Sequence, residues 1–241
     1  MPHPVVRNRR QPSAIVNSLG YPDTIPGLLN LWKADSLTTL NDGDLISSWP
    51  DAKAGNILSA AGTARPTFKT NIFGNKPVAR FDGTANTMGM SSTITLSITT
   101  GFTVIACWAG NGGAGTRYLL SRTGAGAGGI RVDEPLAQWF EYDGVVFPSS
   151  NPSGGTGTNA FVGGFRYTTT AKFRQNKSSL GDTQGALTLD IGINTLGSFQ
   201  GLIQFFLGDL AEIMFYNNAL SDSVCDGIYD NYLKLKYTTL P

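Results

Sequence analysis

The chain has 241 residues, a length that suits one large all-β domain or two small ones. Charged residues make up only 15% of it and glycine fills 30 positions, which favours many short strands joined by tight turns over a helical protein. The formal net charge of +1 gives no overall attraction to nucleic acid or to an anionic membrane, so we expect neither as a partner.

The first 26 residues differ in composition from the rest of the chain. They hold five of the twelve prolines and three arginines, Arg7, Arg9 and Arg10. Proline fixes φ and removes a backbone donor, so this stretch cannot join a sheet interior or a helix. We interpret residues 1–26 as an extended arm that becomes ordered on a neighbouring subunit, where its arginines contact carboxylates. A mobile terminus without a function is the alternative.

No apolar segment typical of a secretory signal follows these arginines, and no apolar run approaches the roughly 18 residues of a membrane span. We therefore expect a protein that is made in a host cytoplasm and carries no signal peptide.

From residue 27 onward, strand-like runs alternate with turn clusters. Residues 102–108 are apolar on both faces, which predicts a central strand covered on each side. Residues 136–142 are rich in aromatic side chains and are followed by the turn dipeptide Asp143-Gly144.

The single predicted helix spans residues 222–237, with Ser221 as its N-cap. An apolar stripe at helical spacing marks the side that should be buried, against a sheet edge or the seam between two sheets. The stripe consists of Val224, Ile228, Tyr232 and Leu235.

Several motifs follow one another in a characteristic order. They are Leu-Trp-Lys-Ala-Asp at 31–35, Ile-Ser-Ser-Trp-Pro-Asp at 46–51, Arg-Pro-Thr-Phe at 65–68, Pro-Val-Ala-Arg-Phe-Asp-Gly at 77–83, and Gly-Asp-Leu-Ala-Glu-Ile-Met-Phe-Tyr-Asn-Asn-Ala-Leu-Ser-Asp at 208–222. This set resembles the laminin G-like domains of the concanavalin A-like lectin/glucanase superfamily, of the type found in bacteriophage virion proteins. The resemblance covers roughly residues 27–237.

The resemblance implies an all-β fold. We expect a two-sheet antiparallel sandwich of the concanavalin jelly-roll type, with one short C-terminal helix and an extended N-terminal arm. The domain organisation is then an arm at 1–26 and one laminin G-like domain at 27–241. Trp32 and Trp49 belong to the structural signature of this family, so we expect both in the core.

The superfamily contains glucanases, so the resemblance allows an enzyme. Glycoside hydrolysis needs two carboxylates on one face of the site, which on a strand means positions i and i+2 or i+4. Glu141 and Asp143 form one such pair, but valines stand where the family glucanases place a third acid. Asp209 and Glu212 are three residues apart, which predicts opposite faces. The only histidine, His3, lies in the arm. We therefore expect no catalytic residues and no enzyme.

Binding sites were considered next. The run Asn-Asp-Gly-Asp at 41–44 offers oxygen ligands for calcium, which some related domains bind, but the same residues serve as a turn without a metal. We expect no cofactor, with calcium as the open alternative. For carbohydrate, which needs aromatic platforms beside hydrogen-bonding groups, Trp139, Tyr142 and Asp143 are the candidates.

Two functional interpretations remain. The first is a structural protein of a phage virion: a capsid decoration or cement protein, or a component of a head or tail fibre. It would be a homo-oligomer that binds the major capsid protein or other virion subunits through its arm. The second is a lectin-like module that binds glycans of a host surface.

Overall fold

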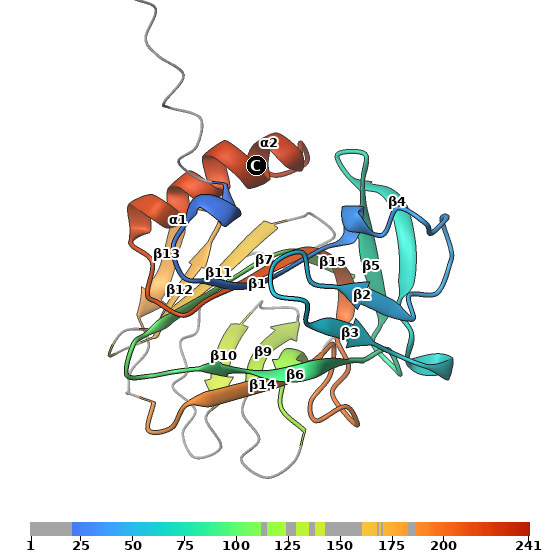
Figure 1. The fold of residues 1–241 in the computed structure, drawn as a ribbon, viewed down its shortest axis with the longest axis horizontal. Coiled ribbons are helices and arrows are strands. Elements are labelled where there is room, and N and C mark those ends of the chain that lie inside the picture. Colours follow the sequence, from blue (N-terminus) through green and yellow to red (C-terminus); the bar gives the residue numbers. More distant parts are fainter. Residues whose placement is uncertain are drawn as a thin grey trace, which may run out of the picture.

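The computed structural model describes residues 21–111, 115–123, 129–134, 138–142, 161–167, 169, 171–182 and 187–241. Within these residues the chain forms two antiparallel sheets, of eight and seven strands. Figure 1 shows the two sheets stacked against each other. The predicted all-β, two-sheet sandwich with a short C-terminal helix is confirmed.

The first sheet has a long central strand that carries neighbours along its whole length. Its strands are, in spatial order, β13 (Ser178–Asp182), β12 (Ala171–Gln175), β11 (Phe161–Tyr167), β7 (Phe102–Gly110), β15 (Leu207–Tyr216), β5 (Lys76–Asp82) and β4 (Thr67–Phe73), with β1 (Leu28–Lys33) also paired to β15. β7 runs along one side of β15, while β5 and β1 share its other side: β5 pairs with 207–210 and β1 with 212–216.

The second sheet packs against one face of the first. Its spatial order is β10 (Gln138–Tyr142), β9 (Gly129–Glu134), β8 (Gly115–Ser121), β14 (Ile191–Leu196), β6 (Met88–Leu96), β3 (Ile57–Ser59) and β2 (Ser48–Pro50). Short 3-10 helices at Pro22–Thr24, Ala34–Ser36 and Gly62–Ala64 complete the connections that are described.

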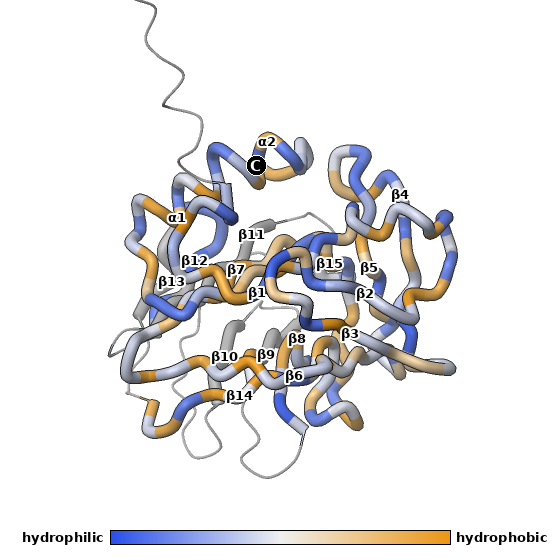
Figure 2. The backbone as a smooth tube through the Cα atoms, viewed as in Figure 1, coloured by the Kyte–Doolittle hydropathy of each residue, from blue (hydrophilic) through white to orange (hydrophobic). Residues whose placement is uncertain are grey.

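The main core lies between the two sheets. Alternate residues of the strands supply it, and β7 is buried along its whole length because both of its faces are covered, as predicted for 102–108. Figure 2 shows how apolar and polar positions are distributed along the chain.

The two tryptophans of the motif region lie in this core and connect the two sheets at its edge. Trp32 and Trp49 are both fully buried, which confirms their predicted place. The Trp32 Nε1–H donates to the Trp49 carbonyl at 3.1 Å, and the Trp49 Nε1–H donates to the Lys33 carbonyl at 3.0 Å. Each buried indole N–H thus finds a partner, and β1 is tied to β2 across the sandwich.

Asp51 closes the same corner. Its carboxylate accepts hydrogen bonds from the Leu31 N–H at 2.8 Å and from the Asn30 side chain at 2.6 Å. It also accepts from the backbone N–H groups of Lys53 and Ala54, at 2.8 and 3.0 Å. The Trp-Pro-Asp motif is therefore a structural clamp.

The helical segment is continuous but changes its winding. It consists of α1 (Asp222–Ile228), a π-helical turn (Tyr229–Leu233) and α2 (Lys234–Lys236). Ser221 caps it as predicted, accepting from the Val224 N–H at 3.3 Å. Among the described residues, no helix is long and apolar enough to span a membrane.

The π turn moves the buried stripe away from the predicted positions. A π turn takes one residue more than an α turn, so Ile228 is followed on the buried side by Leu233 and then by Tyr237, all fully buried. Leu235, which α-helical spacing predicts to be buried, is 71% exposed.

The helix lies on the outer face of the eight-stranded sheet, so the prediction that it packs on a sheet edge or the seam is wrong (Figure 1). The outward side chains of this sheet's central strands are themselves apolar. Because their exposure to water would destabilise the fold, they pack against the helix and form a second core with it. This second core includes Leu31, Val78, Ile105, Cys107, Met214, Tyr216, Ile228, Tyr229, Leu233 and Tyr237.

Only the end of the predicted arm is described. Residues 1–20, with Arg7, Arg9 and Arg10, lie outside the described residues. Within 21–26, Pro22 is buried and the Tyr21 ring lies 5.7 Å from that of Tyr232 on the helix. This part of the arm segment is held against the sandwich of its own chain.

The Asp51 clamp makes a stability prediction. Asp51→Ala leaves several donors without an acceptor, of which those on Asn30 and Leu31 are buried, and should lower the free energy of unfolding by at least about 2 kcal/mol. Urea unfolding followed by tryptophan fluorescence measures this. Asp44→Ala, which removes an acceptor from the Asn41 N–H in an exposed turn, is the matched control and should cost under about 1 kcal/mol. Equal losses in both variants would contradict the clamp.

Candidate functional site

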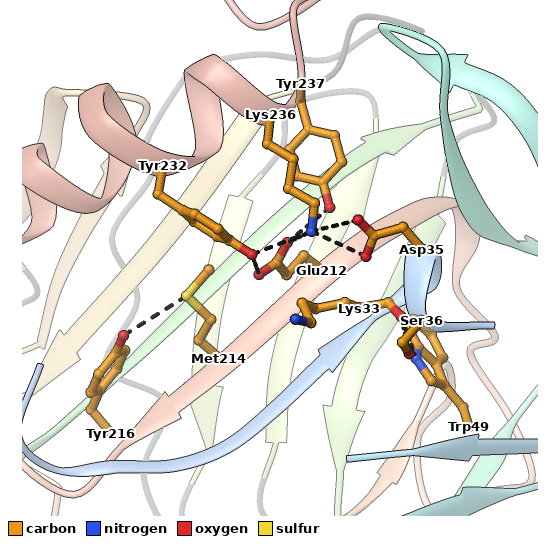
Figure 3. A network of polar contacts seen from close by, with 10 residues as sticks. All are labelled: Lys33, Asp35, Ser36, Trp49, Glu212, Met214, Tyr216, Tyr232, Lys236 and Tyr237. Atoms are coloured by element: carbon orange, nitrogen blue, oxygen red, sulfur yellow. Dashed lines mark hydrogen bonds and ion pairs between the residues drawn. The ribbon is translucent and has the colours of Figure 1, made fainter. Parts of the chain in front are cut away.

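A buried acid joins the helix to the sheet. Glu212 of β15 is fully buried, and its carboxylate accepts from three groups of the helical segment, drawn in Figure 3. The donors are the Tyr232 hydroxyl at 2.7 Å, the Lys236 Nζ at 2.7 Å and the Tyr237 hydroxyl at 2.9 Å. Every partner comes from the helix or its end, so this one side chain fixes where the helix lies.

Lys236 extends the network to a third element. Its Nζ lies 3.1 Å from the nearer carboxylate oxygen of Asp35, in the 3-10 turn after β1. It also lies 5.4 Å from the ring centroid of Tyr232 and 5.1 Å from that of Tyr237. One ammonium thus contacts two carboxylates and lies between two aromatic rings.

Burial controls the protonation of this network. Burial raises the pKa of Glu212, against the opposing effect of Lys236 and the hydroxyl donors. Burial and then the Glu212 charge raise the pKa of Tyr232 far above its usual value, so its hydroxyl stays protonated and acts as a donor. The arrangement keeps the phenols neutral.

Glu212 reaches the helix because β15 contains a bulge. The register with β7 shifts between Leu210 and Glu212. Leu210 and Ile213 belong to the core between the sheets, whereas Ala211 belongs to the outer core under the helix. The extra residue therefore lets both Ala211 and Glu212 face the helix.

The same bulge overturns one sequence prediction. Asp209 lies opposite Arg80 and binds it through two contacts of 2.7 Å. Arg80 lies between Ala79 and Phe81, which face the inner core, so Asp209 lies on the outer face, as Glu212 does. The prediction of opposite faces is wrong, because it assumed strict alternation along the strand.

A shallow depression of about 400 Å³ lies above this network. Its wall combines an aromatic pair with charged and amide groups. It is lined by Tyr21, Lys33, Asp35, Lys76, Asn231, Tyr232, Leu235 and Lys236. Tyr21 is 46% exposed, and its ring packs against the ring of Tyr232, which holds the exposed ring in place.

The predicted carbohydrate residues lie elsewhere. Trp139 and Tyr142 are in β10, at the edge of the seven-stranded sheet, where their backbones pair with Val132 and Gly129. Asp143 lies outside the described residues, and the side chains of Trp139 and Tyr142 are not described. The depression takes no residue from this strand.

The residues considered for calcium bind one another and their neighbours. Asp42 accepts from the Lys69 Nζ at 2.6 Å and the Thr70 N–H at 2.8 Å, and Lys69 lowers the pKa of Asp42. Asp44 accepts from the Asn41 N–H at 2.7 Å. Among the described residues no group of three or more acids, histidines or cysteines could hold a metal ion. Both carboxylates of this turn are thus used in contacts within the chain.

Neither Tyr21 nor Glu212 carries a sequence signal that marks it as a site residue. Glu212 was considered only as a partner of Asp209, and its true partners lie 20 to 25 residues further along, with Asp35 joined through Lys236. Tyr21 stood inside a segment interpreted as an arm. Only the contact between the Tyr21 and Tyr232 rings identifies Tyr21 as part of the wall of the depression.

Comparison with known proteins shows the fold. No family model matches the chain, and no curated protein matches its sequence. A sialidase of Trypanosoma rangeli in complex with 2,3-difluoro-KDN shares the fold with a TM-score of 0.57 at 14% identity, over 88% of this chain and 33% of that one. The chain thus spans about a third of the sialidase chains that it matches.

Two smaller structures match as well. Domain 4 of AbnA, a GH43 extracellular arabinanase from Geobacillus stearothermophilus, in complex with arabinotriose, gives a TM-score of 0.60 at 13% identity, over 85% of this chain and 98% of that one. The binding domain of Paraclostridial Mosquitocidal Protein 1 gives 0.58 at 11% identity, over 86% and 52%. At these identities the likeness is one of fold.

The comparison corrects the prediction that the chain is not an enzyme. The solved structures with this fold include a sialidase and part of an arabinanase, so the fold occurs within the chains of enzymes. The spacing of Asp209 and Glu212 does not exclude an enzyme either, because the bulge in β15 places both side chains on one face. The exclusion of an enzyme therefore does not hold.

The buried network predicts a pH-dependent defect. Lys236→Met leaves the Glu212 carboxylate buried without its cation and should cost about 3–5 kcal/mol of stability at pH 7. A carboxyl whose pKa is raised on folding stabilises the fold below its unfolded pKa, and this contribution is lost as the pH rises through the folded pKa. Losing the cation raises that pKa further, so the defect should shrink as the pH falls towards 4.5, the ordinary value.

Thermal and urea unfolding of both proteins between pH 4 and pH 8 measure the defect. Lys234→Met, two residues away and exposed, is the matched control and should cost under about 1 kcal/mol at every pH. A Lys236→Met defect that stays constant across this range would contradict the account of Glu212.

Proposed function

We propose that this chain is a lectin-like module that binds glycans in the depression beside the helix. The observation that carries the proposal is the exposed Tyr21 ring, supported by Tyr232 and bordered by the polar groups of Lys33, Lys76 and Asn231. An amphipathic ring beside convergent hydrogen-bonding groups suits a sugar, which presents an apolar C–H face and a rim of hydroxyls.

The comparisons support a binding role without assigning it. One structure with this fold is a domain in complex with arabinotriose, and another is the binding domain of a mosquitocidal protein. Both are similar over more than four fifths of this chain. The position of the depression in this chain rests on its own residues alone.

A second proposal concerns the setting of the module. The ordered motifs resemble phage virion domains, and the preceding segment holds five prolines and three arginines. We propose that the chain is a homo-oligomeric virion component, a decoration or cement protein or part of a fibre. In this proposal residues 1–20 bind the major capsid protein or another virion subunit.

Substitution of Tyr21 tests the glycan site. Tyr21→Ala removes the exposed ring and should weaken the binding of an oligosaccharide identified on a glycan array by about 2 kcal/mol, roughly 30-fold in Kd, because a central aromatic contact carries much of a binding energy. Isothermal titration calorimetry measures the Kd. Leu202→Ala, which alters a side chain that is 73% exposed and does not line the depression, should leave it unchanged.

The rival site on β10 is tested in the same assay. If Trp139→Ala or Tyr142→Ala abolishes binding while Tyr21→Ala does not, the site lies on the seven-stranded sheet and the proposal for the depression is wrong.

Deletion of residues 2–20 tests the virion proposal. The truncated chain keeps Tyr21 and the sandwich, so it should bind glycan normally but no longer be incorporated into particles. The interaction of the full chain should weaken as salt is raised, because exposed arginine contacts are screened. Incorporation of the truncated chain at the level of the full chain would contradict this role for the arm.

A further inference from the structure

We propose that the ligand of the depression is an oligosaccharide that carries a carboxylate, and that Lys33 and Lys76 bind this group. The inference rests on the proposed glycan-binding function and adds the chemical class of the sugar. It comes from the distribution of charge in the depression.

The acidic groups of the depression are already occupied. The Lys236 Nζ lies 2.7 Å from Glu212 and 3.1 Å from Asp35, and Glu212 is fully buried beneath it. The two tyrosine hydroxyls take up the rest of the Glu212 carboxylate. Both carboxylates therefore already contact Lys236, which shares its single positive charge between them.

Two further lysines line the depression and take no part in this network. Lys33 and Lys76 line the same depression, and neither has an ion-pair or hydrogen-bond partner for its ammonium among the described residues. In Figure 3 no dashed line reaches the Lys33 Nζ, although Lys33 stands opposite Glu212 in the ladder between β1 and β15. Asp23 acts on the Tyr232 hydroxyl from the adjacent 3-10 helix but does not line the depression. The wall thus presents an excess of positive charge.

The fold brings these two lysines together from separate strands. β5 pairs with β15 only as far as Leu210, and from Glu212 onward β1 takes its place. Lys76 begins β5 and Lys33 ends β1, so they stand on either side of this exchange of neighbours. Pro77 follows Lys76 and has no N–H to donate, which suits the end of β5 that pairs with β4 but not with β15.

The position of Lys33 is fixed at its backbone. Its carbonyl accepts from the Trp49 Nε1–H at 3.0 Å and from the Ser36 hydroxyl at 2.7 Å. Both lysines are half-buried, so part of each stem is packed while the ammonium remains available. Two ammonium groups beside an aromatic ring match a sugar ring that bears an acidic substituent.

The test uses pairs of sugars that differ only in charge. An oligogalacturonide is compared with its methyl ester, and sialyllactose with lactose, so that the acid comes from a uronic or a sialic residue. We expect at least one acidic member to bind about tenfold or more tightly than its neutral partner, with a preference that falls as salt rises. Calorimetry at two salt concentrations measures each Kd.

Substitution of the lysines assigns the preference. Lys33→Gln combined with Lys76→Gln should remove the preference for the acidic sugar while the weaker binding of its neutral partner persists. Lys33→Arg combined with Lys76→Arg keeps the charge and should retain the preference. Lys53→Gln, which changes an exposed lysine outside the depression, is the control, and circular dichroism checks that each variant is folded.

The other possible outcomes contradict either the preference for a carboxylate or the glycan site itself. Equal binding of the acidic and neutral sugars, both lost in Tyr21→Ala, keeps the glycan site but refutes the inference. Equal binding of a sulfated oligosaccharide through the same lysines refutes the assignment to a carboxylate. If no sugar binds, or if Tyr21→Ala has no effect on binding, the proposed function fails together with the inference.

Discussion

The position of the C-terminal helix depends on one buried carboxylate. Glu212 lies in the middle of an otherwise apolar interface, and a charge placed there destabilises the fold unless it is fully paired. Lys236 and two tyrosine hydroxyls supply that pairing from the helix. Other registers of the helix on the sheet leave the acid unpaired, so the network selects one register. The depression exists because the helix is held there.

The same constraint links the sandwich to the candidate site. The bulge in β15 turns Glu212 outward, and β5 gives way to β1 along that strand, where Lys33 and Lys76 line the same depression. Tyr21 then packs on a helix whose place is already fixed. A feature of the central strand therefore determines the shape and the charge of a surface made from four separate parts of the chain.

The sequence predicted the two-sheet fold, the helix, its cap and the buried Trp32 and Trp49, because these follow from short-range periodicity and ordered motifs. The sequence-based prediction was wrong where one extra residue shifts the alternation of buried and exposed side chains. The π turn exchanges Leu235 for Leu233 on the buried side, and the bulge places Asp209 and Glu212 on one face. Neither irregularity has a local sequence signal, and Lys236 and Asp35 are 201 residues apart.

The proposed glycan recognition between Tyr21 and the two lysines can be tested by an amide NMR titration of the labelled chain with an acidic oligosaccharide. We expect the shift changes to concentrate at Tyr21, at Lys33 and Lys76, and at the helix around Asn231. Changes concentrated in 138–142, with none around Tyr21, would contradict it.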